Sequence, residues 1–124
     1  MPSAAPPPDD KLEQELRRGA IVLAVLSQLS GWQYGYSLRQ LLAARGMEIE
    51  EGTLYPLLRR LETQGLLVSE WRIEDGPPRR YYKQSPAGRA LYGRLVENWN
   101  GLVDTVGGLI ADGGTGAKRR KDSR

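Results

Sequence analysis

Four leucines in the middle of the chain constrain its fold more than any other feature. They recur at i, i+3, i+4 and i+7, the spacing that places side chains on one face of an α-helix, and they are Leu54, Leu57, Leu58 and Leu61. Pro56 lies about one turn into the segment, where a missing amide donor costs least, so this helix is expected to begin near Gly52. Gly65 is expected to end it.

Two further helices are predicted before this one. A first helix is expected over residues 11–29, and its apolar centre implies burial on more than one side, one of which a second subunit could cover. Gly31 is suited to a left-handed cap at its end. A second helix is expected from residue 34 or 36 to Gly46, with three leucines facing inward: Leu38, Leu41 and Leu42.

The C-terminal half predicts a β-hairpin and a long helix. Residues 66–73 and 79–83 have the composition of strands, and a Pro-Gly turn joins them. Ser85 and Pro86 form an N-cap and first-turn proline for a helix that reaches about residue 110. Its apolar residues follow a near-heptad spacing, which is typical of an association surface. This predicted dimer interface comprises Leu91, Leu95, Trp99, Leu102, Val106 and Leu109.

The order of these elements predicts a mainly α-helical fold with a small β-hairpin wing. In fold-class terms this is an α+β winged helix-turn-helix over residues 11–84, followed by a C-terminal dimerisation helix over residues 85–111. The Pro-rich residues 1–10 are expected to be disordered, and residues 112–124 are expected to form a flexible basic tail.

Composition excludes most catalytic chemistry. The chain has no Cys and no His, which removes disulfides, thiolate metal sites and the commonest general base, so no catalytic residue, metal or cofactor is predicted. An enzyme that works with carboxylates alone is the remaining catalytic alternative, although no paired acids suggest one. The longest apolar run, residues 20–26, is far short of the roughly 20 residues that a membrane helix needs. A cytoplasmic protein without a membrane contact is therefore expected.

The distribution of charge is more informative than its sum. The chain holds 18 basic and 15 acidic residues, for a formal charge of +3. Residues 118–124 contain five basic residues and one acid, a pattern that fits either a solubilising end or a non-specific nucleic-acid arm. Residues 59–94 contain eight basic residues against four acidic ones. The third helix and the hairpin therefore carry the basic surface of the folded part.

A basic helix beside a basic hairpin suits double-stranded DNA. The major groove, about 12 Å wide, admits an α-helix, and a hairpin can reach the adjacent backbone or minor groove. The predicted contacts are Thr53, Tyr55, Arg59 and Arg60 on the helix, with Arg79 and Arg80 on the hairpin. Alternatives remain open for each group. The helix arginines could belong to a solvated face, the hairpin arginines could pair with Glu70 or Glu74, and Tyr81 and Tyr82 could pack the hairpin.

Three segments resemble the PadR family of bacterial winged-helix transcription regulators. They are YGYSLRQLL (34–42), GTLYPLLRRLETQGLL (52–67) and GPPRRYYKQSPAGR (76–89), and the single long helix after the hairpin resembles the short PadR subfamily. The resemblance implies an obligate homodimer that binds an operator with two half-sites and represses transcription. It also adds Tyr34 and Tyr36 to the DNA-binding residues. The chain departs from the family in having Tyr34 where His is common, Glu50 where Ser is common, and Gln84-Ser85 in place of Leu-Thr, a change that keeps the cap and loses an apolar contact.

Similarity to multidrug-sensing short PadR-like regulators implies a ligand site at Trp99. In those regulators a tryptophan of the last helix and its symmetry mate stack against a planar aromatic compound. The expected wall residues are Leu16, Gly19, Ala20, Leu23 and Val103. The alternative is that Trp99 is an aromatic residue of the dimer interface and nothing more. The sequence thus predicts a ligand-responsive DNA-binding repressor, with a winged-helix protein-interaction module as the alternative function.

Overall fold

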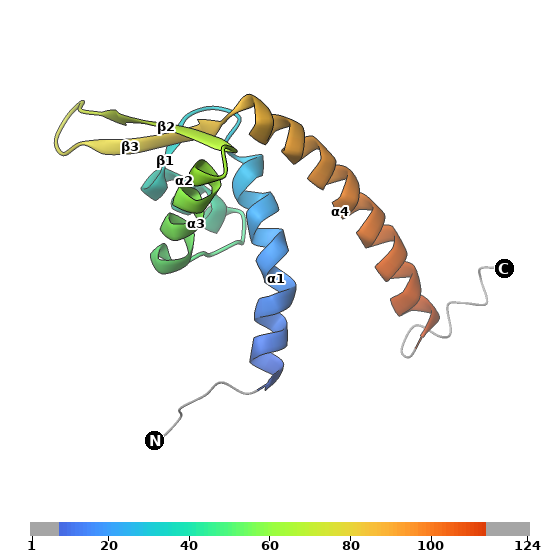
Figure 1. Cartoon of the computed structure of the whole chain (residues 1–124). Coiled ribbons are helices and arrows are strands. Elements are labelled where there is room, and N and C mark those ends of the chain that lie inside the picture. The colour runs from blue at the N-terminus through green and yellow to red at the C-terminus, as the bar shows by residue number, and fades with distance from the viewer. Residues whose placement is uncertain (1–7, 114–124) are drawn as a thin grey trace, which may run out of the picture. The chain divides into compact units, whose positions relative to one another are not determined.

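The computed structural model describes residues 8–113 of the 124-residue chain (Figure 1). Its elements are α1 (Pro8–Ser27), β1 (Gln33–Tyr34), α2 (Gly35–Ala44), α3 (Glu51–Thr63), β2 (Leu67–Arg72), β3 (Arg79–Gln84) and α4 (Pro86–Asp112). They form two compact units, the first of which ends at Tyr92 and the second of which begins at Gly93, both within α4. The predicted mainly helical winged fold is confirmed.

The leucine stripe of α3 forms the centre of the core of the first unit. All four of its leucines are buried, and Leu54 is fully so, as the helical spacing predicts. Side chains from α1, the turn after it, α2 and β2 complete the core, and they include Leu26, Leu29, Leu38, Leu42 and Leu67. Burial of this apolar surface fixes α3 with its opposite face towards solvent. The helix begins at Glu51, one residue before the expected start.

Both ends of α1 differ from the prediction. The helix runs from Pro8 to Ser27, so residues 8–10, which the sequence predicts to be disordered, are helical, and the helix stops two residues before the expected end. A proline fits the first helical position because no amide donor is needed there. The remainder of the expected N-terminal disorder, residues 1–7, and of the expected tail, residues 114–124, lies outside the described residues.

Gly31 does not cap α1, and the buried Gln84 explains why. Gly46, Gly65 and Gly76 adopt left-handed backbone angles among the described glycines, whereas Gly31 does not. The side-chain amide of Gln84 donates to the Leu26 carbonyl (2.7 Å), and its backbone amide donates to the Leu29 carbonyl (2.8 Å). These bonds satisfy carbonyls at the end of α1, so no left-handed residue is required. The buried polar side chain of Gln84 thus ties the hairpin to α1.

The wing is a three-stranded antiparallel sheet and not the two-stranded hairpin expected from the sequence. The strand order is β1-β3-β2, with Tyr34 opposite Tyr81 and Trp71 opposite Arg80. The sequence does not reveal β1 because two residues are too few to show an alternating pattern. Gly76, with φ of 94°, forms the turn at the tip of the hairpin.

The start of α4 is fixed by the predicted Ser85 cap. The Ser85 hydroxyl accepts a hydrogen bond from the Gly88 amide (3.0 Å) and donates to the Gly65 carbonyl (2.6 Å). The Ser85 amide donates to the carbonyl of Leu66 (3.0 Å). A Cβ atom at Gly88 would collide with that same carbonyl oxygen. The first turn of α4 therefore packs directly on the backbone between α3 and β2.

The rest of α4 carries exposed apolar side chains. It continues through Asp112, the first residue of the segment expected to be a tail. Leu91, Leu95 and Val96 are half-buried, whereas the large apolar residues beyond them are exposed in the single chain: Trp99, Leu102, Val103, Val106, Leu109 and Ile110. Within residues 8–113, no helix has the length and apolar character needed to cross a membrane.

Candidate nucleic-acid interface

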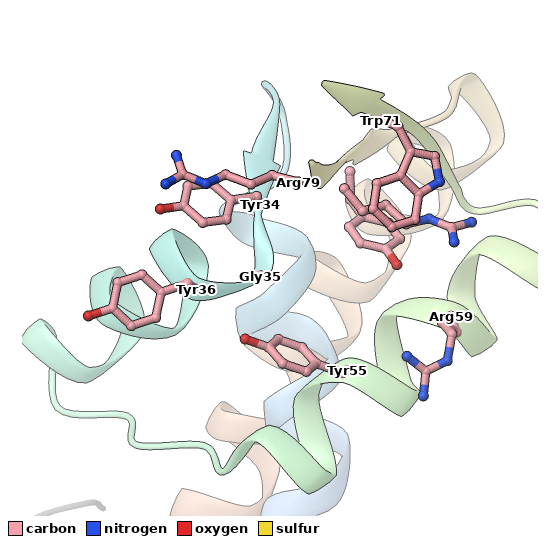
Figure 2. Close-up of a pocket in the computed structure, with 9 residues that line it drawn as sticks. Tyr34, Gly35, Tyr36, Tyr55, Arg59, Trp71 and Arg79 are labelled. Carbon is pink, nitrogen blue, oxygen red and sulfur yellow. The ribbon is translucent and has the colours of Figure 1, made fainter. Parts of the chain in front are cut away.

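A groove opens between α3 and the wing. It has a volume of about 310 Å³, and residues from five elements line it (Figure 2). The lining residues are Tyr34 of β1, Gly35 and Tyr36 of α2, Tyr55 and Arg59 of α3, Trp71 of β2, and Arg79, Arg80 and Tyr82 of β3. The groove brings together six of the eight residues that the sequence predicts to bind DNA. Thr53 and Arg60 lie on exposed positions of α3 and do not line it.

Gly35 allows Tyr55 to sit in the floor of the groove. A Cβ atom at Gly35 would collide with the Tyr55 ring, so glycine permits this close approach between the start of α2 and α3. Figure 2 shows the Tyr55 ring extending from α3 towards Gly35. The glycine of the Tyr-Gly-Tyr segment therefore has a packing role that the sequence pattern does not reveal.

Arg59 and Arg79 are the cationic groups of the groove that lack acidic partners in the described part of the chain. Neither forms an ion pair with any of the described residues, and both are exposed. The Arg79 guanidinium lies over the Tyr34 ring, 4.7 Å from its centroid, which orients it without neutralising it. Since a guanidinium offers five donors and no acceptor, these two residues are suited to phosphate or to a guanine edge.

Arg80 differs from its neighbour because it is held inside the domain. Its guanidinium forms an ion pair with Glu62 of α3 (3.0 Å) and donates to the hydroxyl of Ser69 (3.2 Å). Ser69 in turn donates to the same Glu62 carboxylate (2.6 Å). The sequence leaves Glu70 and Glu74 open as partners, whereas Glu70 pairs with Arg72. Arg80 thus links the wing to the end of α3, a contact that sequence spacing does not show.

A series of cations and aromatic rings runs across the strands of the wing, and we term it the cation–aromatic ladder. Arg72 lies 4.1 Å from the Tyr81 ring centroid and 5.4 Å from that of Trp32, and Lys83 lies 5.0 Å from that of Trp32. The Tyr81 and Tyr34 centroids are 5.3 Å apart. The hydrogen bond from Arg72 to Glu70 raises the pKa of the Arg72 guanidinium. Tyr81 therefore packs the wing, in agreement with the alternative left open by the sequence.

Tyr82 completes the floor of the groove and is nearly buried. Burial raises the pKa of its phenol above the ordinary value, because the ionised form would lose hydration. The phenol therefore stays neutral at pH 7. Tyr36 is half-exposed and accepts a hydrogen bond from Gln40 (2.9 Å). Tyr82 thus adds no charge to a groove whose net character is set by its arginines.

The region that contains the groove matches a known protein family. The model of the transcriptional regulator PadR-like family matches residues 22–94, which is more than half of the chain and includes every residue of the groove. The chain belongs to the PadR-like family. It is 46% identical over 108 residues to transcriptional regulator Rv3488 of Mycobacterium tuberculosis, covering 83% of this chain and 98% of that protein.

Solved structures of PadR-like proteins have the same fold. A PadR family transcriptional regulator from Eggerthella lenta is 46% identical, with a TM-score of 0.76 over 82% of this chain and 90% of the other. A PadR-like transcription factor from Bacteroides fragilis is 34% identical, with a TM-score of 0.69 over 81% and 99% of the two chains. These relatives place this PadR-like chain among transcriptional regulators and not among enzymes. Within its described part, no three acidic side chains gather as a metal site would require.

Proposed function

We propose that this PadR-like regulator is a homodimer that binds double-stranded operator DNA and represses transcription. In this proposal α3 enters the major groove, and the wing contacts the adjacent backbone. The observation that carries the proposal is the groove between α3 and the wing, which presents Arg59 and Arg79 beside the rings of Tyr34 and Tyr55, neither arginine having an acidic partner within residues 8–113. A protein-interaction module has no need of two unpaired guanidinium groups at this position.

Binding to the DNA upstream of the protein's own gene tests this function. We expect a specific complex in an electrophoretic mobility assay, and we expect its affinity to fall steeply with salt because phosphate contacts release counterions. A scrambled duplex of the same length and composition is the control. Equal binding to both duplexes at every salt concentration would favour the protein-interaction module.

The exposed apolar stripe of α4 supports dimerisation through this helix. Exposure of such an apolar stripe to water is unfavourable, and a second protomer would cover it. We expect a dimer in sedimentation velocity at micromolar concentration and a monomer for Leu102→Glu, which places a charge in the stripe. Asn100→Glu introduces the same charge on the other side of the helix and is expected to remain dimeric. A monomeric wild-type protein would contradict the proposed interface.

We further propose that a planar aromatic effector binds at Trp99 of the dimer and alters the separation of the two α3 helices, one from each protomer. That separation must be about 34 Å for both helices to enter successive major grooves. The exposed fraction of Trp99 is 46% in the single chain, and that of Leu16, a proposed wall residue, is 81%. The other proposed wall residues are Gly19, Ala20, Leu23 and Val103. A Cβ atom at Gly19 would meet nothing within 4 Å, and this open space is compatible with such a wall.

Tryptophan fluorescence tests the effector site. We expect planar aromatic dyes to quench the emission with micromolar affinity, because stacking on an indole ring quenches it, and we expect Trp99→Ala to abolish the quenching. Trp32→Phe, which removes a tryptophan of the first unit, is the matched control and is expected to retain the titration. Quenching that is unchanged in Trp99→Ala would exclude this site.

A further inference from the structure

The wing presents an aromatic side chain to which neither the sequence pattern nor the comparisons assign a function. Trp71 of β2 lines the groove, and 62% of its surface is exposed. It shares one side of β2 with Leu67 and Ser69, so it lies on the face of the sheet that is turned towards α3. Figure 2 shows its indole ring on the wing side of the groove and Arg59 on the α3 side. The indole thus lines the same groove as both unpaired arginines.

The Trp71 ring contacts an arginine of the neighbouring strand that is itself fixed. Its cross-strand neighbour is Arg80, whose guanidinium lies 5.5 Å from the indole centroid. Arg80 is in turn fixed by Glu62 (3.0 Å) and by Ser69 (3.2 Å), so a closed set of contacts joins the end of α3 to the ring. Because the charge of Arg80 is balanced by Glu62, this arginine is better placed to orient the indole than to bind a phosphate.

We propose that Trp71 packs against the deoxyribose of the DNA backbone between the phosphates bound by Arg59 and Arg79, and that Arg80 is its positioning residue. This inference rests on the proposed DNA-binding function. A sugar face is the apolar part of a backbone that the two arginines would otherwise engage through charge alone. The contact carries no base-specific information, so it strengthens binding to all duplexes alike.

The salt dependence of binding separates this contact from a phosphate contact. We expect Trp71→Ala to lower the affinity for the upstream duplex about tenfold, because an uncharged apolar contact is lost. The slope of log affinity against log salt is expected to remain unchanged, since no phosphate contact is removed. Scrambled duplex is expected to lose the same factor. Trp71→Phe should keep most of the affinity. Val68→Ala, which truncates an exposed side chain on the opposite face of β2, is the control and should bind as the wild type does.

Glu62→Ala tests the role of Arg80 because the two possible roles predict changes in DNA affinity of opposite sign. If Arg80 positions Trp71, removal of Glu62 frees the arginine and weakens binding, and adding Trp71→Ala to Glu62→Ala costs little more. If Arg80 is a phosphate contact restrained by Glu62, the same change strengthens binding and steepens the salt slope. Stronger binding would therefore overturn the positioning role.

Two results would overturn the proposal for Trp71 itself. One is wild-type affinity in Trp71→Ala, and the other is a salt slope that falls by about two, one for each protomer, which would show that the variant acts through a lost phosphate contact. Trp71→Phe guards against misfolding, because it keeps an aromatic ring on the wing. Failure of the wild-type protein to form any specific complex would instead reject the proposed function, so the two failures are distinguishable.

Discussion

Replacement of both Arg59 and Arg79 by alanine is expected to lower operator affinity by a factor of about 1,000 or more, because a dimer loses four contacts of at least about 1 kcal/mol each. Each arginine that binds a base edge or phosphate contributes about 1–3 kcal/mol, and a dimer loses both groups twice. The two groups are the groove cations without acidic partners among the described residues, so no internal ion pair is broken by the change. Titration of the upstream duplex in a mobility-shift assay, repeated at several salt concentrations, measures the loss.

A charge-matched variant controls for the general effect of lower net charge. Arg17 and Arg18 are exposed on α1 and lie outside the groove, so Arg17→Ala/Arg18→Ala removes the same charge elsewhere. We expect a much smaller loss and little change in the salt slope for this pair. Equal losses in the two double variants would mean that the groove has no special part in DNA binding.

Gly88→Ala is expected to destabilise the fold by about 3 kcal/mol or more. The new Cβ atom would collide with the Leu66 carbonyl oxygen, which is backbone and cannot turn aside as a side chain can. That oxygen also accepts the hydrogen bond from the Ser85 amide (3.0 Å), so any movement away from the methyl group breaks the start of α4. Urea unfolding followed by circular dichroism measures the free energy of unfolding, and an insoluble variant would agree with the same cause.

Gly93→Ala is the control in the same helix. Gly93 is exposed, and a Cβ atom there would meet nothing within 4 Å, so alanine is expected to stabilise the helix by about 0.5–1 kcal/mol through its higher helix propensity. The two substitutions are chemically identical and should shift the free energy of unfolding in opposite directions. Similar stability of Gly88→Ala and the wild-type protein would contradict the close approach at Leu66.

The features that the sequence predicts well are those encoded within a few residues. The four-leucine stripe specifies α3 because its period alone decides which face is buried, and all four leucines are buried. The Ser85 cap and the helix ends near Gly46 and Gly65 depend on local backbone chemistry, and the structure contains each of them. The groups of basic residues on α3 and the hairpin likewise predict that the two elements share a surface.

Long-range contacts could not be predicted in this way. β1 depends on pairing with β3, which lies far along the chain and places Gln33 opposite Tyr82. The end of α1 depends on Gln84 and not on the nearby Gly31. The partner of Arg80 is Glu62, which lies 18 residues earlier and on another element. Trp71 is an ordinary strand residue by composition, and only its place in the groove suggests a function.

The cation–aromatic ladder has a consequence for how quickly the protein can engage DNA. Arg72 lies between the rings of Trp32 and Tyr81, and the ladder and the strand pairing together join all of the strands of the sheet before any partner arrives. The conformational entropy of ordering the base of the wing is therefore lost during folding and is not subtracted from the binding free energy. Encounter with DNA then requires no slow rearrangement of the hairpin. Association should be governed by diffusion and by the electrostatic attraction between guanidinium groups and phosphates.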